Sequence, residues 1–298
     1  MKILICGANG QLGCELSRLL EQGFAEIGPI PECYKDAEVS QTDIDDLDIT
    51  DPAAVDSFVG AGGFDLLINA AAMTNVDACE TNEEAAYRIN ALGAQNLARA
   101  AAESGAKIVH ISTDYVFSGD EAAPRVEGDR PDPQSAYGRT KLAGELLVQE
   151  ANPRHFVIRT AWLYGYVGKN FVKTILKLAR EQGFIKVVDD QRGNPTSAND
   201  LAYEILRIAA TQGFGIYHCT NKGSCSWFDF AAAIVDIAAI DCKKIPCTTA
   251  EFPRPAKRPA FSSLRNKHLE DSIGDEMRPW QEALEAYLGN LEELGGVL

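Results

Sequence analysis

Short apolar runs alternate with longer amphipathic segments over the first half of the chain. Four runs are predicted as buried strands, at residues 2–6, 65–69, 107–112 and 155–160. Between them, apolar residues recur at helical spacing, which predicts helices at 11–21, 83–104 and 135–150. Strands that are separated by helices pair in parallel through right-handed crossovers. The pattern therefore predicts an α/β fold with a doubly wound parallel sheet.

Two parts of the chain depart from this rhythm. Pro29 and Pro31 interrupt the region of the second strand, where only 37–39 keeps strand character, so we expect an insertion before a short strand. The pattern also changes after Thr160, although no linker separates the two halves. In this second half we expect helices at 170–181, 200–211, 228–240 and 279–294, and strands at 185–188 and 215–219.

A glycine-rich sequence, Gly7-Ala-Asn-Gly10-Gln-Leu-Gly13, follows the first predicted strand and opens the first helix. Glycines there allow the backbone to approach a pyrophosphate, and the free N–H groups of the helix start favour an anion. A tight turn without a ligand is the simpler alternative. The position at the first strand–helix junction favours nucleotide binding in a Rossmann-like sheet. We predict a dinucleotide-binding domain at 1–160 and a mainly substrate-binding lobe at 161–298, with segments near 185–212 returning to the first domain.

The net charge, the apolar runs and the cysteines exclude several kinds of partner. The chain has 298 residues and a net charge of −15, which disfavours nucleic acid as a partner. No apolar run approaches the ~20 residues of a membrane span, and the N-terminus lacks the pattern of a signal peptide. We therefore expect a cytoplasmic protein without a membrane partner. The eight cysteines form no C-x-x-C pair, so the sequence predicts no metal site.

The end of the second strand should contact the adenosine ribose of a dinucleotide. Ser40, Gln41 and Asp43 are the candidates, and no Arg or Lys accompanies them to pair with a 2′-phosphate. An acidic residue suits a free 2′-hydroxyl, which favours NADH over NADPH weakly. Asp48 and Ile49 precede the next predicted helix and are expected to flank the adenine.

Tyr137 and Lys141 are four residues apart in a predicted helix, so their side chains share one face. An ammonium near a phenol should lower the phenol's pKa and make it a better proton donor. Such pairs are often only solvated surface pairs. Here, however, Thr113 ends a predicted strand upstream and can donate a hydrogen bond to a carbonyl, and Asn90 could anchor a proton-relay water. This combination predicts hydride transfer between a nicotinamide and a carbonyl or alcohol.

At this point the sequence resembles the extended short-chain dehydrogenase/reductases that act on nucleotide sugars. Within that family it is most similar to the dTDP-4-dehydrorhamnose reductases. The matching stretches run from Gly7 to Pro259 and are GANGQLG, LDITD, INAAAMTNVDACE, STDYVFSGD, PQSAYGRTKLAGE, RTAWLYG, DQRGNPTSANDLA and RPAKRP. The resemblance implies reduction of the C4 keto group of dTDP-4-dehydro-L-rhamnose by NADH or NADPH, for cell-surface polysaccharide synthesis. A homodimer and a magnesium ion occur in this family, but no ligand spacing here identifies a magnesium site.

The resemblance also implies roles for individual residues. Tyr137 would donate the proton to the sugar, Lys141 would bind the nicotinamide ribose, and Thr113 would complete the triad. The implied cofactor contacts are Gly10, Gln11 and Leu12 at the pyrophosphate, Asp48 and Ile49 at the adenosine, and Ala72, Met73 and Thr74 near the nicotinamide. Asp114 and Trp162 would contact the nucleotide sugar. The basic loop 254–259 is either a solvated loop or, through Arg254, Lys257 or Arg258, a diphosphate site.

Single residues bear on three alternative functions: dehydration, reduction of another sugar, and non-catalytic binding. Sugar-nucleotide dehydratases carry an Asp-Glu pair after the Thr, whereas Asp114 is followed by Tyr115 here, so the dehydration base is missing. A reductase of another nucleotide-linked 4-keto sugar stays open. A non-catalytic dinucleotide-binding subunit that resembles the beta subunit of methionine adenosyltransferase also stays open, although Thr113, Tyr137 and Lys141 favour catalysis.

Overall fold

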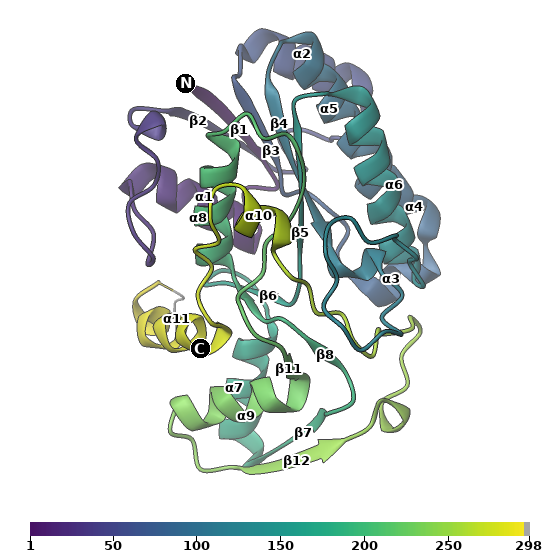
Figure 1. Ribbon diagram of the computed structural model, residues 1–298, viewed down its shortest axis with the longest axis vertical. Coiled ribbons are helices and arrows are strands. Elements are labelled where there is room, and N and C mark those ends of the chain that lie inside the picture. Colours follow the sequence, from purple (N-terminus) through teal and green to yellow (C-terminus); the bar gives the residue numbers. More distant parts are fainter. Residues whose placement is uncertain (295–298) are drawn as a thin grey trace.

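The computed structural model describes residues 1–294, as a large parallel sheet with helices on both faces and a smaller lobe below it (Figure 1). All neighbouring strands of the six-stranded sheet pair in parallel. In spatial order they are β10 (Gly215–His218), β5 (His155–Thr160), β4 (Lys107–Thr113), β3 (Leu66–Asn69), β1 (Lys2–Cys6) and β2 (Glu38–Thr42). The order reverses between β1 and the neighbouring β3, which confirms the predicted doubly wound, Rossmann-like sheet.

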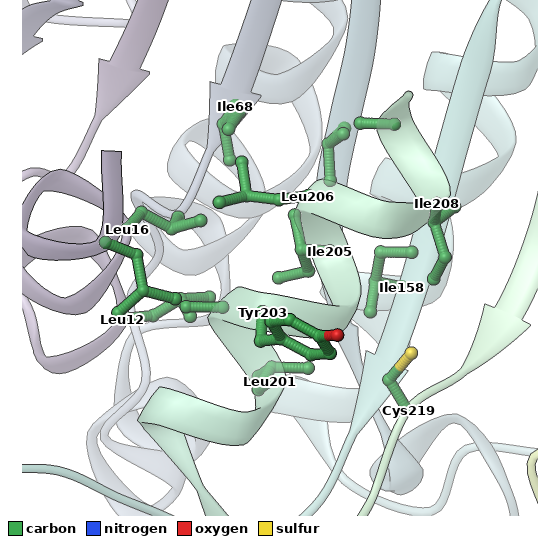
Figure 2. Close-up of a cluster of buried hydrophobic side chains, with 14 of the residues drawn as sticks. Leu12, Leu16, Ile68, Ile158, Leu201, Tyr203, Ile205, Leu206, Ile208 and Cys219 are labelled. Carbon is green, nitrogen blue, oxygen red and sulfur yellow. The ribbon is translucent and has the colours of Figure 1, made fainter. Parts of the chain in front are cut away.

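Two helices cover one face of the sheet. They are α1 (Gln11–Gln22) and α8 (Ala198–Ala209), which pack against each other although they are far apart in the sequence. Figure 2 shows Leu12 and Leu16 of α1 near Leu206 of α8 and Ile68 of β3, all of them buried. Burial of such side chains stabilises each by about 1.5–3 kcal/mol, so this apolar layer fixes α1 and the loop before it on the sheet.

The opposite face is covered by α2 (Pro52–Gly62), α5 (Ala94–Glu103) and α6 (Ala136–Ala151) (Figure 1). The predicted helix 83–104 is divided here. It begins as α4 (Glu83–Tyr87), continues as a π-helical segment, η2 (Arg88–Gly93), and ends as α5. A short helix, α3 (Val76–Thr81), precedes it.

The smaller lobe contains three further helices and short two-stranded pairings. The helices are α7 (Phe171–Gln182), α9 (Trp227–Ile237) and α11 (Trp280–Leu294), which share one apolar cluster. The strand pairs are β7 (Phe184–Val188) with β12 (Lys243–Cys247), β8 (Arg192–Gly193) with β11 (Cys225–Ser226), and β6 (Leu163–Tyr164) with β9 (Thr196–Ser197). The short helix α10 (Lys267–Asp271) lies beside β10, and single 3₁₀ turns are η1 (Glu32–Tyr34), η3 (Asp114–Val116) and η4 (Thr249–Glu251).

Segments after Thr160 are distributed over both parts of the molecule. Helix α8 and strand β10 belong to the large sheet and its cover, whereas β7, which starts the segment 185–212, pairs with β12 in the smaller lobe. Strand β2 is longer than the three residues expected for it. The division of the chain into two functional domains stays a prediction.

Candidate active site

Two adjacent cavities lie at the carboxyl ends of β1, β3, β4 and β5. The first has a volume of about 330 Å³ and the second about 570 Å³. Gly7, Gly10, Ala70 and Ala72 line both of them, so the glycine-rich loop stands between the two. The carboxyl ends of parallel strands on either side of a change in strand order are where such sheets bind ligands.

The glycine-rich loop fits a dinucleotide through its close backbone packing. Gly7 has φ +77°, and a Cβ there would lie 2.6 Å from the amide nitrogen of Ala71. A Cβ on Gly13 would lie 2.6 Å from the Cα of Ala8, so α1 could not start so close to the loop with any larger residue. The resulting cradle leaves the start of α1 open to the second cavity, where backbone N–H groups can bind a pyrophosphate.

The first cavity matches the predicted adenosine region. Asp43, Asp48 and Ile49 line it, as does the exposed Ile44, which the sequence analysis missed. The Asp43 carboxylate accepts hydrogen bonds from the backbone N–H of Asn9 at 3.2 Å and of Ile44 at 2.8 Å. Ser40 and Gln41, the other candidates for the ribose contact, are not among its lining residues.

Thr113, Tyr137 and Lys141 meet at the second cavity. Helix α6 holds the last two, and Ser135 caps its start by accepting a hydrogen bond from the Gly138 N–H at 3.1 Å. The Tyr137 side chain bonds to that of Thr113. Gln11, Leu12, Gly13, Thr74, Asp114 and Trp162 line the same cavity.

The protonation of Tyr137 differs from the expectation. Burial raises the pKa of the Tyr137 hydroxyl well above 10, although the hydrogen bond with Thr113 opposes the shift. Burial also lowers the pKa of Lys141 to about 8, against the influence of the Glu145 carboxylate. The Lys141 Nζ donates to the carbonyl oxygen of Ile111 at 2.6 Å. The expected lowering of the Tyr137 pKa was therefore wrong for this structure, because burial raises that pKa and the nearby Asp114 carboxylate adds to the rise.

Asp114 presents a buried carboxylate at the second cavity. Its Oδ1 accepts a hydrogen bond from the Thr113 hydroxyl at 2.9 Å, and within residues 1–294 its buried Oδ2 has no hydrogen-bond partner. Burial raises the pKa of Asp114 to about 6, and hydrogen bonds from Ser262, Thr113 and the backbone oppose the shift. An unpaired polar atom of this kind is costly unless a ligand binds it.

Asn90 holds the loop after β3. Its Oδ1 accepts from the Met73 N–H at 2.8 Å, and its Nδ2 donates to the Met73 carbonyl at 3.2 Å and to the Thr140 hydroxyl at 3.1 Å. Ala72 and Thr74 on either side of Met73 line the cavities, whereas Met73 itself does not. The structure thus gives Asn90 a backbone-holding contact, and its water-anchoring role stays a prediction.

A stacked pair of tryptophans forms one wall of the second cavity. Trp162 and Trp227 have ring centroids 3.5 Å apart and planes inclined by 7°. Trp162 has φ +47°, a conformation that side chains other than glycine rarely adopt and that is frequent at binding sites. Trp227, at the start of α9, was missed because no motif in the sequence distinguishes it from a core aromatic.

The basic loop does not line either cavity. Arg254 is exposed, and neither Arg254 nor Arg258 is among the lining residues. Arg258 pairs with Asp77 at 3.0 Å, and Lys257 with Asp120 at 3.5 Å. The diphosphate role of this loop stays a prediction.

The described part of the chain offers neither a metal-binding cluster nor a membrane-spanning helix. Within residues 1–294 no group of three or more His, Cys, Asp or Glu side chains is arranged to hold a metal ion. Over the same residues, none of the helices combines the length and the hydropathy that a membrane crossing requires.

Comparisons with known proteins agree with this geometry. The chain is 39% identical to the spore coat polysaccharide biosynthesis protein SpsK of Bacillus subtilis over 287 residues, which covers 96% of each chain. It is 40% identical to the dTDP-4-dehydrorhamnose reductase of Mycobacterium tuberculosis over 290 residues, 95% of this chain and 91% of that one.

Two solved structures of dTDP-4-dehydrorhamnose reductases are also similar to this chain. A dTDP-4-dehydrorhamnose reductase from Clostridium acetobutylicum has a TM-score of 0.93 at 50% identity, covering 98% of this chain and 100% of that one. A dTDP-4-dehydrorhamnose reductase from Bacillus anthracis, solved in complex with NADP, has a TM-score of 0.91 at 39% identity and covers 97% and 99%. The profile of the RmlD substrate binding domain matches residues 1–293. The resemblance drawn from the sequence is thereby confirmed, and the chain belongs to the RmlD substrate binding domain family.

Proposed function

We propose that this protein reduces the C4 keto group of dTDP-4-dehydro-L-rhamnose to give dTDP-L-rhamnose, using a nicotinamide dinucleotide, in the synthesis of a polysaccharide precursor. The observation that carries the proposal is the meeting of Thr113, Tyr137 and Lys141 at a cavity bounded by the glycine-rich loop. The relatives named dTDP-4-dehydrorhamnose reductase support the substrate.

The cofactor would be held by the glycine-rich loop, with Asp43, Asp48 and Ile49 at its adenosine and Lys141 at its nicotinamide ribose. When bound, it supplies the hydride. The remaining chemistry belongs to side chains of this protein.

Tyr137 acts as the general acid. Its raised pKa keeps the hydroxyl protonated at neutral pH, so the proton is present when the carbonyl oxygen acquires negative charge. The Thr113 hydroxyl forms a hydrogen bond with Tyr137, and its single proton points to the Asp114 Oδ1 in this structure. Donation to the same carbonyl oxygen would require that proton to turn from Asp114 to the substrate. The cationic form of Lys141 stabilises the phenolate that remains after proton transfer. Asp114 and Trp162 would bind the sugar nucleotide, since both line the same cavity.

The replacement Tyr137→Phe tests this assignment. It should lower kcat for dTDP-4-dehydro-L-rhamnose by about 10²-fold or more, because the acid is removed, while the binding of reduced nicotinamide cofactor is retained. Activity is followed by reduced-nicotinamide absorbance, and binding by its fluorescence. Wild-type protein that oxidises neither NADH nor NADPH with this sugar would overturn the proposed substrate. A variant as active as wild type would overturn the role of Tyr137.

We further propose that NADH is preferred to NADPH. The residues that line the first cavity include Asp43 and Asp48 but no Lys or Arg, and a 2′-phosphate beside Asp43 is repelled. The kcat/KM ratio for NADH over NADPH should be about tenfold, and Asp43→Asn should reduce it, since about 1.4 kcal/mol of repulsion gives a factor of ten. A wild-type ratio below one would contradict the preference and agree with the NADP-bound relative from Bacillus anthracis.

The cytoplasmic location, the homodimer and a bound magnesium ion stay predictions. Sedimentation measures whether the protein is a homodimer, and repeating it with EDTA tests whether a magnesium ion supports that dimer.

A further inference from the structure

A buried histidine lies beneath Lys141, and the proposed mechanism does not use it. His110 of β4 is fully buried, with its Nε2 3.4 Å from the Nζ of Lys141. On its other side, its Nδ1 is 3.2 Å from the Nδ2 of Asn69, at the end of β3. Asn69 in turn precedes the loop whose residues line both cavities.

The directions of these hydrogen bonds follow from one backbone group. The N–H of Ala71 can only donate, and it donates to the Asn69 Oδ1 at 3.1 Å. The other amide atom of Asn69 is therefore the NH₂ group, which donates to the Nδ1 of His110. Nδ1 then carries no proton, so a neutral His110 carries its proton on Nε2.

The Nε2–H of His110 faces the Nζ of Lys141, which already donates to the Ile111 carbonyl. An N–H pointed at an ammonium is repelled, whereas an N–H pointed at a neutral amine meets a lone pair. Protonating His110 instead would place an N–H against the NH₂ of Asn69. The arrangement thus keeps His110 uncharged and makes protonation of Lys141 less favourable than that of an ordinary lysine, without preventing it at neutral pH.

We propose that His110 is a positioning residue that holds Lys141 against the Ile111 carbonyl and disfavours its protonation, linking Lys141 to the cofactor-binding loop through Asn69 and Ala71. The consequence for activity rests on the proposed function, but the hydrogen-bond chain does not. Burial lowers the pKa of both His110 and Lys141. His110 is therefore uncharged at neutral pH, whereas Lys141, with a pKa of about 8, keeps its proton at pH 7 but loses it more readily than an ordinary lysine.

The other titratable groups around Lys141 either raise its pKa, in contrast to His110, or line the second cavity beside it. Glu145, one turn further along α6, raises the pKa of Lys141, but its carboxylate is bound by Arg159 of β5 at 2.7 Å. Asp114 of η3 and Tyr137 of α6 line the cavity together with Lys141. Only His110 directs a hydrogen-bond donor at Nζ among the partners that the structure describes for Lys141.

The tautomer can be measured without any substrate. The other three histidines, His155, His218 and His268, each place Nδ1 against a backbone carbonyl and so carry their protons on Nδ1 when neutral. Long-range ¹⁵N–¹H correlation spectra of ¹⁵N-histidine-labelled full-length protein at pH 8 should show one Nε2–H tautomer and three Nδ1–H tautomers. Four Nδ1–H tautomers, or a doubly protonated His110, would overturn the proposal whether or not the protein is a reductase.

The influence on Lys141 is tested by cofactor binding as a function of pH. Between pH 7 and pH 9 the Kd of wild-type protein for NADH should rise about tenfold, since Lys141 loses its proton through a pKa of about 8. The variant His110→Gln can turn its amide oxygen toward Lys141, so its rise should be at least threefold smaller.

The matched control is His155→Gln, at the far end of β5, which should keep the wild-type pH profile. Circular dichroism confirms folding, and His110→Asn is the second variant if His110→Gln does not fold. An unchanged pH profile in a folded His110 variant would overturn the influence on Lys141. Failure of the sugar assay with an intact tautomer pattern would overturn only the proposed reductase function.

Discussion

The buried carboxylate of Asp114 makes the stability of the fold depend on pH. Its pKa, raised by burial from 3.8 to about 6, means that the folded protein binds the proton more tightly than the unfolded chain does. The stability of the fold therefore falls as pH rises from about 4 to 6 and stays at the lower level above that range. The Oδ2 of Asp114, buried without a hydrogen-bond partner among the described residues, accounts for part of this loss of stability.

We predict that Asp114→Asn stabilises the protein at pH 7 by up to about 3 kcal/mol, with the gain vanishing near pH 4, because the variant has no charge to desolvate. The same change should raise the KM for the sugar nucleotide. Urea unfolding at both pH values gives the stability, and Asp120→Asn, at an exposed position, is the control. A variant that is less stable than wild type at pH 7 would show that the carboxylate is well paired.

The residues of the candidate site were predictable where a motif fixes both type and spacing. The glycine-rich loop and the Tyr137–Lys141 pair are examples, since both are local in sequence and belong to one element junction or one helix face. Trp227 and Ile44 were not predictable, because only tertiary packing brings them to a cavity. Arg258 was predicted from the basic composition of its loop; in the structure it pairs with Asp77, and its diphosphate role stays a prediction.

Helix α6 is fixed to the sheet by a buried ion pair. Glu145 accepts two hydrogen bonds from the guanidinium of Arg159 in β5, at 2.9 and 2.7 Å, and a third from the Ser112 hydroxyl of β4. Both charged side chains are almost fully buried. The pair therefore sets the position of the helix that carries Tyr137 and Lys141.

Replacing Glu145 by Ala should lower the free energy of unfolding by about 3–5 kcal/mol, because Arg159 would keep an uncompensated buried charge. Denaturant titration checks this value. Asp56→Ala removes the partner of Arg99 in an exposed pair and should cost less than about 1 kcal/mol. Equal losses in the two variants would mean that water reaches Arg159 in the folded state.

Elements with a strong apolar pattern were predicted within a few residues, and the exceptions have physical causes. The helix predicted at 83–104 contains the π-helical η2, which side-chain spacing cannot distinguish from an α-helix. Strand β12 was missed because its sequence, Lys-Lys-Ile-Pro-Cys, lacks an apolar run and pairs only with β7. Strand β2 lies at an edge of the sheet, where polar residues are tolerated, so only part of it looked like a strand.

The smaller lobe is joined to the large sheet by contacts between residues far apart in the chain. Arg278 bonds to the carboxylates of Glu26 at 2.8 Å and of Asp200, while the Tyr166 hydroxyl donates to Glu26 at 2.5 Å. The Nδ2 of Asn170, at the start of α7, donates to the side-chain oxygen of Gln11 in α1 at 3.1 Å. These pairings depend on the assembled fold, which is why no local pattern predicted them.

The charge of the whole molecule opposes the binding of its proposed ligands. The chain carries −15. Among residues 1–294, the side chains lining the two cavities include Asp43, Asp48 and Asp114 but only one cation, Lys141. Local and global charge thus have the same sign as a dinucleotide or a nucleoside-diphosphate sugar. Affinity must come from the backbone N–H groups of the glycine-rich loop, from hydrogen bonds and from apolar contact.

We therefore predict that the affinity for NADH increases when NaCl is raised from 10 to 150 mM, because the Debye length shrinks from ~30 Å to ~8 Å and the repulsion is screened. A two- to threefold fall in Kd, about 0.4–0.65 kcal/mol, is expected by fluorescence titration. Reduced nicotinamide mononucleotide, which has fewer phosphate charges, should respond less. An affinity that falls with salt would mean that the N–H groups at the start of α1, with Lys141, create a positive potential that outweighs the rest of the molecule.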